Sequence, residues 1–515
     1  AKVRGNDMSN ESTDDDLDVD SSASGLAHVD NMYAAWFIMY LQGVGALFPW
    51  NAFITPFDYF QLRFKDSEFE ASFESIFTTT FTLIGLLTII ALQWLQEHLS
   101  LYTRITGSLS ILFCIFLLVT ILAVVPLFTS DASFSDSLSS GANIQFVVLE
   151  LCVGLSGCAV AVLTGSIMSY SSIFGSGAYI QAVIGGQGIA GLTVALGNML
   201  RTLPSITNDC ESNNESTATH DRQVVLGAAV YFGASCAILL LCLLSFIKCE
   251  RLDFTLACHK QVQSAAPLSP VLRSEPPVLE ADPARFTPQR DAISSRSTQN
   301  SSTLPLLDPT ASVHDDDALS PYTQLSGPRA SPPLFATLWK WCVAVTGIYS
   351  VTIALFPSLT ATIISTGSGK PGGDDCMWAH QGNGLFGPFL FVMFNLGDTI
   401  GRNLPPKLSR ANVVLALVAC RVVFIPLFVL CKTDDADKLF SSSDAFPILI
   451  MLVFAVSNGW LTTCIFVHSA LAVPPELRQR AGTFLVLFLN TGLAIGSMLS
   501  FFTHWLECDC NPFLT

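Results

Sequence analysis

The residues of this sequence best suited to chemistry inside a membrane gather in one apolar segment, residues 384–405 (GLFGPFLFVMFNLGDTIGRNLP). Four of its side chains follow one another at spacings of four, three and four positions: Phe391, Asn395, Asp398 and Arg402. An α-helix places residues at these spacings on one face. The face then offers an aromatic surface, an amide, a carboxylate that accepts hydrogen bonds and a guanidinium that donates them. This set suits a ligand that carries hydroxyl groups and ring nitrogens.

Two readings of the charged residues on this face are open. An ionisable group inside a membrane span costs about 2.5–3.5 kcal/mol on insertion scales, so such a group is by default a functional candidate. Asp398 and Arg402 stand at i and i+4, where they can pair. In the alternative reading, Arg402 reaches toward the membrane surface near Pro405 and Asp398 only neutralises it. That alternative leaves Asn395 on the same face unexplained, so we favour a binding site.

The first apolar run, which starts at Tyr33, offers a second candidate. Pro49 within QGVGALFPWNAFITPF predicts a kink, because proline removes a backbone hydrogen bond. Interrupted helices near the middle of the membrane are where transporters place substrate sites. Trp50 and Asn51 follow the proline at once, and an indole there could stack on a flat ring, at roughly 1–3 kcal/mol. A tryptophan of the interface belt is the alternative, but Trp50 lies too far into the run to favour it.

Other polar residues within apolar runs give weaker signals. Glu150 and Arg421 are expected to form an ion pair, with each other or with a third group, and His468 is expected to be a hydrogen-bonded structural residue. Residues 186–191 match G-x-G-x-x-G, but with no strand before them they indicate a close helix–helix contact rather than a dinucleotide site. The sequence shows no P-loop, no metal-ligand spacing and no hydrolase motif, so we expect no cofactor and no enzyme.

Composition indicates the kind of protein in which these residues lie. Only 13% of the 515 residues are charged, against about 25% in an ordinary soluble protein, while half are hydrophobic and the mean hydropathy is +0.51. A chain of this length could not cover a soluble surface with so little charge, so lipid must solvate much of it. Soluble enzymes and nucleic-acid-binding proteins are therefore excluded. The net charge of −16 arises mainly in the polar segments outside the apolar runs.

Hydropathy predicts an all-α polytopic membrane protein with eleven transmembrane helices. A helix needs about 20 apolar residues to cross a bilayer, and eleven runs approach this length: 33–57, 76–96, 104–128, 144–173, 178–200, 222–247, 335–363, 383–403, 411–431, 446–471 and 480–503. The weakest division falls at residues 174–177, a glycine turn without charge; if that turn belonged to one tilted span, the count would be ten.

The apolar runs also set the domain organisation. Lysine and arginine near the span ends favour a cytoplasmic N-terminus. We expect a disordered acidic N-terminus over 1–32, a six-helix bundle over 33–249, a disordered cytoplasmic loop over 250–333, a five-helix bundle over 334–505 and an extracytoplasmic tail over 506–515. Asn214, in an Asn-Glu-Ser triplet between the fifth and sixth spans, is a predicted glycosylation site. The outward-facing cysteines could form disulfides, but the sequence does not fix their pairing.

Several motifs, in order along the chain, resemble the equilibrative nucleoside transporters. The most specific are the Pro49-Trp50-Asn51 and Phe394–Arg402 patterns; the others are residues 186–191, Phe356-Pro357, Ser457-Asn458-Gly459 and residues 492–496. The eleven spans, cytoplasmic N-terminus and long inner loop of that family agree with the hydropathy pattern. The resemblance implies a major-facilitator-like bundle of six plus five helices, which works by alternating access around a central cavity.

The resemblance also implies which residues line that cavity: Leu47, Trp50, Phe356, Phe391, Asn395, Asp398, Arg402 and Leu493. The carboxylate and the guanidinium would hold the ribose and the polar edge of the base. Thr164 stands where family members often have a glutamine that reads the base, and its shorter hydroxyl cannot make the same paired hydrogen bonds. Ile54 stands where some relatives have a methionine.

The sequence therefore predicts a facilitative, ATP-independent transporter of nucleosides, with transport of nucleobases and proton linkage open. Its partners would be the nucleoside and membrane lipid, not nucleic acid, and we expect a monomeric glycoprotein. The alternatives are a transporter of another small organic solute and a receptor or scaffold that acts through residues 250–333. The sequence leaves open whether the plasma membrane or a vacuolar or lysosomal membrane holds the protein.

Overall fold

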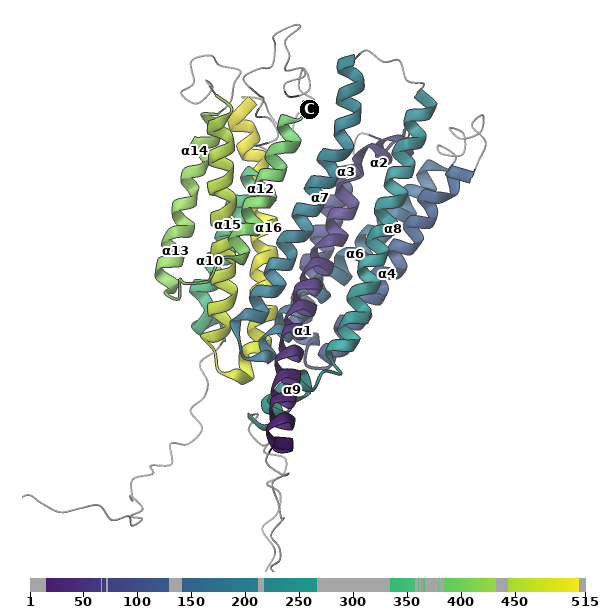
Figure 1. Ribbon diagram of the computed structural model, residues 1–515. Helices are drawn as coiled ribbons and strands as arrows, with labels where there is room; N and C mark the ends of the chain where they lie inside the picture. The colour runs from purple at the N-terminus through teal and green to yellow at the C-terminus, as the bar shows by residue number, and fades with distance from the viewer. Residues whose placement is uncertain are drawn as a thin grey trace, which may run out of the picture. The chain divides into compact units, whose positions relative to one another are not determined.

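The computed structural model describes residues 15–65, 67–70, 73–128, 141–211, 217–265, 334–356, 360, 363, 365, 378, 384–431 and 443–508, and in these ranges regular structure is entirely helical (Figure 1). The first half contains α1 (Asp15–Ile54), α2 (Phe57–Arg63), α3 (Phe73–Leu95), α4 (Leu101–Val124), α6 (Ala142–Ser171), α7 (Gly177–Glu211), α8 (Thr217–Cys249) and α9 (Asp253–Ala265). The second contains α10 (Leu334–Leu355), α12 (Phe386–Asn403), α13 (Ala411–Cys420), α14 (Phe424–Val429), α15 (Ala445–Leu471) and α16 (Arg478–Cys508). The predicted all-α class is confirmed.

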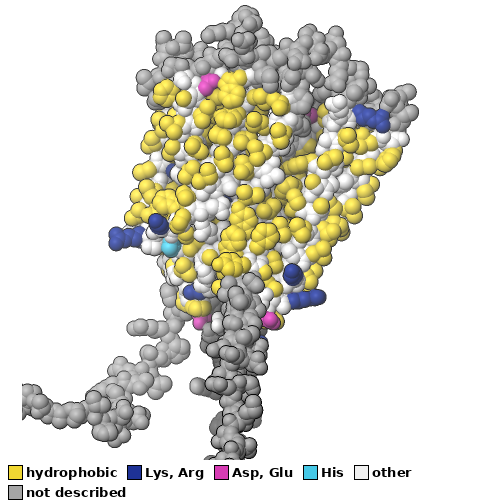
Figure 2. Space-filling view, in the orientation of Figure 1, with side chains coloured by type: hydrophobic (Ala, Val, Ile, Leu, Met, Phe, Trp, Pro, Cys, Tyr) yellow, Lys and Arg dark blue, Asp and Glu magenta, His cyan; other side chains and the backbone are white. Residues whose placement is uncertain are grey.

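Within the described residues, ten helices are long and apolar enough to cross a membrane. They correspond to every predicted span but the eighth, which is α12. Asn395, Asp398 and Arg402 lower the hydropathy of this 18-residue helix, and the exact count of eleven stays a prediction. Hydrophobic side chains cover the middle of the face shown in Figure 2, whereas basic side chains lie toward its lower end and one upper corner. This distribution suits a surface solvated by hydrocarbon in the middle and by water at the ends.

The glycine turn between the fourth and fifth spans does divide two helices. A short 3₁₀ turn (Ser172–Phe174) ends α6, and Gly175 follows with φ +70° before α7 begins at Gly177. A residue with a Cβ rarely adopts this left-handed conformation, so Gly175 allows the sharp reversal. The alternative of one long tilted span over 144–200 is therefore wrong.

Two boundaries differ from the predictions. Helix α1 starts at Asp15, so residues 15–32 of the predicted disordered N-terminus are helical; extending a helix already nucleated in the membrane costs little. The same helix continues through Pro49 and ends at Ile54, just before Thr55-Pro56, so the predicted interruption comes later than expected. Proline prevents only the hydrogen bond of its own nitrogen, and the flanking turns maintain the helix.

A short helix also occupies the start of the predicted disordered loop 250–333. Helix α9 packs against α1 and against the 3₁₀ turns η2 (Ser172–Phe174) and η6 (Pro475–Leu477). Its buried face comes from Thr255 and Cys258, and the Phe254 ring stacks on Phe174 with centroids 5.7 Å apart. The apolar face spans three turns only, too short to register as a sustained period. Residues 266–333 lie outside the described residues.

Each half has its own pattern of helix packing. In the first half α1 packs on α7, α3 on α6 and α4 on α8; in the second α12 packs on α15 and α10 on α16. The halves meet where α7 contacts α12 and α15, and where α16 contacts α6 and α3. A large apolar core joins residues of both halves, while two smaller cores each lie within one half, one around Phe48 and one around Phe394 and Phe454.

Several hydrogen bonds between the halves lie at the ends of the helices predicted to be cytoplasmic. The Ser169 hydroxyl, near the end of α6, donates to the Gln479 carbonyl of α16 at 2.6 Å. The Gln181 amide, near the start of α7, donates to the Leu404 carbonyl just after α12 at 2.9 Å. Glu97 and Arg480 form an ion pair at the same end. The two halves are therefore fastened to each other at this end.

Candidate functional site

The polar face predicted for the eighth span lies on α12, and its two charged groups are paired. Arg402 Nε donates to Asp398 Oδ2 at 2.6 Å, and each residue is only 6% exposed. One turn of helix brings them together, as the i, i+4 spacing predicts. Because both charges are buried, each stabilises the other against the cost of leaving water.

Groups on three other helices complete this pair. The Asn458 amide, on α15, donates to Asp398 Oδ1 at 2.7 Å, and the Thr352 hydroxyl, on α10, donates to Asn458 Oδ1 at 2.7 Å. On the other side, Arg402 Nη1 donates to Gln187 Oε1 of α7 at 3.2 Å. The carboxylate thus accepts one hydrogen bond on each oxygen, and the guanidinium links the second half of the protein to the first.

Glycines let the helices that carry these groups approach closely. A Cβ at Gly459 would meet the Asp398 carbonyl and the Arg402 backbone nitrogen, and one at Gly401 would meet the backbone of α15. On α7, a Cβ at Gly188 would press on Arg402 and Thr399, and one at Gly191 would collide with the Asn395 amide oxygen. The contact predicted for residues 186–191 is therefore confirmed, and α12 lies along these glycines.

An aromatic cluster adjoins the polar face. Phe356, at the end of α10, stacks on Phe394 with ring centroids 3.9 Å apart, and its centroid lies 4.8 Å from that of Phe391. The Asn395 amide donates to the Phe391 carbonyl at 2.9 Å, so its nitrogen serves its own helix while its oxygen faces α7. Phe356 and Phe391 thus lie beside the helix face of α12 that carries Asn395, Asp398 and Arg402.

The predicted residues of α1 have their described contacts within the first half. The Trp50 ring packs on Phe81 of α3 with centroids 4.6 Å apart. Leu47 packs on a small core around Phe48 and α7. The Asn51 amide nitrogen is buried and has no hydrogen-bond partner in the described structure, whereas Ile54 is 38% exposed.

The remaining predicted residues are not joined to the polar face by any described contact. Thr164, on α6, is half-buried, and Leu493, on α16, packs on the large core. Asn214, the predicted glycosylation site, lies outside the described residues. Cys431, one of the outward-facing cysteines, is a free thiol.

The weaker polar signals have mixed outcomes. Arg421 forms no ion pair with Glu150 or with any other described residue, so the expected ion pair is wrong. It donates instead to the Phe454 carbonyl at 2.8 Å, to the Thr352 hydroxyl at 3.0 Å and to Ser457. His468 hydrogen-bonds the Pro406 carbonyl at 2.8 Å, which agrees with a structural residue.

Sequence reasoning missed three polar partners of the site: Gln187, Thr352 and Asn458. Asn458 belongs to a resembling motif, Ser457-Asn458-Gly459, but nothing in its spacing ties it to Asp398, 60 positions earlier. Gln187 stands among the glycines of α7, where it looks like part of a packing motif. Thr352 gives no signal, because a single threonine in an apolar helix most often bonds its own backbone.

This architecture, a bundle of membrane-length helices with a buried carboxylate–guanidinium pair where its halves meet, defines a polytopic membrane protein with an internal polar site. The family model described as nucleoside transporter matches residues 151–505, and the chain belongs to that family. Mouse equilibrative nucleoside transporter 2 is 28% identical over 501 residues, which cover 93% of this chain and 98% of that protein. Human equilibrative nucleoside transporter 1 is 25% identical, with 92% and 97% covered.

Solved structures of major facilitator superfamily transporters also align with the chain. The outward conformation of FucP shows 12% identity and a TM-score of 0.46, with 94% of each chain covered. The proton:xylose symporter XylE shows 8% identity and a TM-score of 0.47, with 94% of this chain and 92% of that chain covered.

Proposed function

We propose that this protein carries nucleosides across a membrane by alternating access and without ATP. The observation that carries the proposal is the buried Asp398–Arg402 pair, placed where α12 of the second half meets α7 of the first. Membership of the nucleoside transporter family supports the substrate class. The protein would work as a monomer in lipid, with the six-helix half rocking against the five-helix half.

The polar face has capacity left for a ligand. A carboxylate offers about four lone-pair positions, and Asp398 uses one on each oxygen, so ribose hydroxyls could donate to the rest. Arg402 would donate to acceptors of the base or ribose. In the present conformation both groups are buried, so the proposal requires that separation of α7 from α12 opens the site to water. The inter-half hydrogen bonds of Gln187 and Gln181 are those that would break.

Aromatic groups would hold the flat base. Phe391 and Phe356 border the polar face, and Trp50 would approach from α1 as the halves move. Stacking of a base on one aromatic ring is worth roughly 1–3 kcal/mol. Thr164 replaces the glutamine common in relatives, so recognition of the base edge would rest on fewer hydrogen bonds at that position.

Uptake of a labelled nucleoside panel into vesicles that contain the purified protein tests the proposal. Asp398→Asn and Arg402→Ala should each abolish uptake, because each leaves the partner's charge without its counter-ion. Arg410→Ala, at an exposed position outside the site, serves as the control for a lost guanidinium. Uptake retained by both site variants, in amounts of protein equal to the wild type, would refute the assignment.

Further arms of the same experiment separate the alternatives. Unlabelled adenosine and uridine should compete with the labelled substrate; competition by an organic cation alone would indicate another solute. Deletion of residues 270–330 should leave uptake intact in a transporter, whereas a signalling scaffold would show no uptake in either form. Accumulation above equilibrium under a pH gradient would establish proton coupling, and equal final levels with and without the gradient would exclude it.

A further inference from the structure

We propose that Arg421 is a positioning residue, which fixes the orientation of the Asp398 carboxylate through Thr352 and Asn458. The inference rests on the proposed function, since it concerns the site where a nucleoside would bind. Arg421 lies in η5 (Arg421–Val423), the 3₁₀ turn between α13 and α14, and its described hydrogen bonds go to Phe454, Ser457 and Thr352 rather than to Asp398. Nothing in the Asp398–Arg402 pairing requires a second guanidinium nearby.

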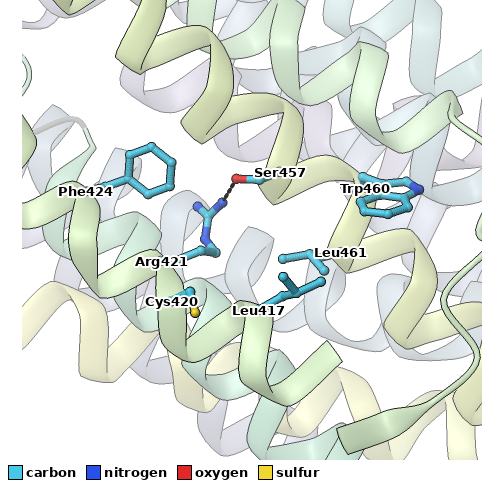
Figure 3. A pocket seen from close by; sticks show the side chains of 7 residues that line it. All are labelled: Leu417, Cys420, Arg421, Phe424, Ser457, Trp460 and Leu461. Atoms are coloured by element: carbon cyan, nitrogen blue, oxygen red, sulfur yellow. Dashed lines mark hydrogen bonds between the residues drawn. The ribbon is translucent and has the colours of Figure 1, made fainter. Parts of the chain in front are cut away.

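Arg421 is buried where the described residues offer it no counter-ion. It is 2% exposed, and its guanidinium lies over the Phe454 ring at 4.4 Å from the centroid. Figure 3 shows the crevice beside it, lined by Leu417, Cys420, Phe424, Ser457, Trp460 and Leu461; among these lining side chains, Arg421 hydrogen-bonds Ser457. No carboxylate in the described part of the chain lies within ion-pair distance of it. A buried charge without such compensation is strongly destabilising, so the polar path toward Asp398 is needed.

Arg421 and Asp398 stand at the two ends of a row of hydrogen bonds, and their chemistry fixes which group donates in each bond. A guanidinium only donates and an ionised carboxylate only accepts. Arg421 Nη2 donates to the Thr352 hydroxyl at 3.0 Å, so that oxygen accepts from one side and turns its own proton to Asn458 Oδ1, 2.7 Å away. Asn458 is then left with its amide nitrogen toward Asp398, to which it donates at 2.7 Å.

Without the Thr352 hydroxyl, or without Arg421 to orient it, Asn458 Oδ1 loses a secure donor and the Asn458 side chain is held at one end only, by Asp398. The Thr352 hydroxyl also hydrogen-bonds the Ile348 carbonyl of its own helix at 2.8 Å, so without Arg421 its proton has a second acceptor to serve. Asn458 could then swing away as a whole, and Asp398 Oδ1 would lose its donor. The carboxylate would be held by Arg402 alone, on one oxygen, and could turn away from the geometry that a ribose needs.

The hydrogen bonds that lead from Arg421 through Thr352 and Asn458 to Asp398 form a relay, and this relay lies within one moving half. Arg421, Thr352, Asn458 and Asp398 all belong to the second half, and their described side-chain hydrogen bonds stay within it; the neighbouring Arg402 side chain crosses to the first half, to Gln187 and Ile184. When the halves separate, the crossing bonds can break while the relay persists. The carboxylate would therefore keep one orientation on both sides of the transport cycle.

Isosteric changes at Thr352 test the relay without removing a buried charge. Thr352→Val deletes the hydroxyl at almost unchanged shape, and Thr352→Ser keeps it. Thr120→Val is the matched control, since among the described residues the Thr120 hydroxyl bonds the Phe116 carbonyl of its own helix, at 2.6 Å, and no other group. Initial rates of labelled nucleoside uptake in vesicles give KM and maximal rate for each variant, normalised to the amount of folded protein.

We expect Thr352→Val to raise KM about fivefold or more, as loss of one orienting hydrogen bond at a buried site implies, with Thr352→Ser and Thr120→Val within about twofold of the wild type. A purely structural role for the hydroxyl would lower the amount of folded protein and leave KM unchanged. A wild-type KM in Thr352→Val would overturn the relay. Absence of nucleoside uptake by the wild type would instead overturn the proposed function.

Discussion

The two strips of side chains predicted to face the substrate differ sharply in how they are held. On α12, Asp398 and Arg402 are hydrogen-bonded to α7 and α15, and through Asn458 to α10. On α1, Trp50 packs only on Phe81 among the described aromatic contacts, and the buried Asn51 amide nitrogen has no partner in the described structure. One strip is fixed before any ligand arrives, and the other retains unsatisfied capacity.

The difference shows how a membrane protein can hold charge and still bind a polar solute. A charged group must be satisfied in the absence of ligand, because an unpaired charge in the hydrocarbon region is too costly. A neutral amide can be left unpaired at a cost of about 1–3 kcal/mol. The α12 strip therefore supplies a rigid, charged grip, and the α1 strip supplies an adaptable surface that gains its partners when the substrate binds.

The rigid strip should fail completely if its helices are forced apart. Gly459→Val places a branched side chain against the backbone of Asp398 and Arg402, where no flexible group can yield. We expect loss of folded protein and of uptake, measured by size-exclusion chromatography and vesicle transport. The control is Gly197→Val, at a helical position where an added Cβ would meet no atom within 4 Å, and this variant should fold and transport. A folded, active Gly459→Val protein would show that α12 and α15 are not held as described.

Substitutions in the adaptable strip on α1 should leave the protein folded but weaken nucleoside binding. Trp50→Ala removes a stacking surface and should weaken nucleoside binding by about tenfold, whereas Trp50→Phe should retain most of it. The matched control is Trp94→Ala, because Trp94 of α3 is 71% exposed; this variant should bind normally. Affinities from ligand-induced thermal shifts provide the measurement. Equal affinities for Trp50→Ala and the control would remove Trp50 from the site.

The fold was predictable because it depends on patterns that are local in sequence. Apolar runs of bilayer length located the membrane helices, and the glycines at residues 175 and 177 located the turn between α6 and α7. The start of α1 and the short helix α9 were missed for the same reason. Residues 15–32 are acidic and Ser-rich, and the buried face of α9 comes from few residues, so neither segment carries a strong apolar period.

Sequence could predict only those features of the site that lie within a single helix. The spacing of Asn395, Asp398 and Arg402 gave the polar face and the ion pair, since both depend on helical geometry alone. The partners on other helices, Gln187 and Asn458, depend on which helices pack together and in what register. That information is not present in any one segment, and its absence explains why Arg421 was expected to meet an acidic group rather than a threonine.

Substitution of Asn51, whose buried amide nitrogen has no partner in the described structure, should raise stability and weaken nucleoside binding. Asn51→Leu removes the buried donor that lacks a partner, so the ligand-free protein should melt at a higher temperature. Nucleoside binding should weaken about fivefold, as expected if that donor is satisfied by the substrate. Asn490→Leu is the control, because the Asn490 amide already bonds the Val486 carbonyl at 2.8 Å and its removal gives no such gain. Lower stability together with unchanged affinity in Asn51→Leu would contradict the comparison of the two strips.

The smallest effect on nucleoside uptake should come from breaking the exposed ion pair of Glu97 and Arg480. Glu97 and Arg480 also join a carboxylate to a guanidinium across the two halves, but their side chains are 57% and 50% exposed. Water and salt screen exposed pairs, so such pairs contribute less than about 1 kcal/mol. Glu97→Gln should therefore change nucleoside uptake by less than about threefold, while Asp398→Asn abolishes it in the same vesicles. If Glu97→Gln also abolished uptake, the ability to pair across the halves, rather than burial, would be what the transporter requires of its charges.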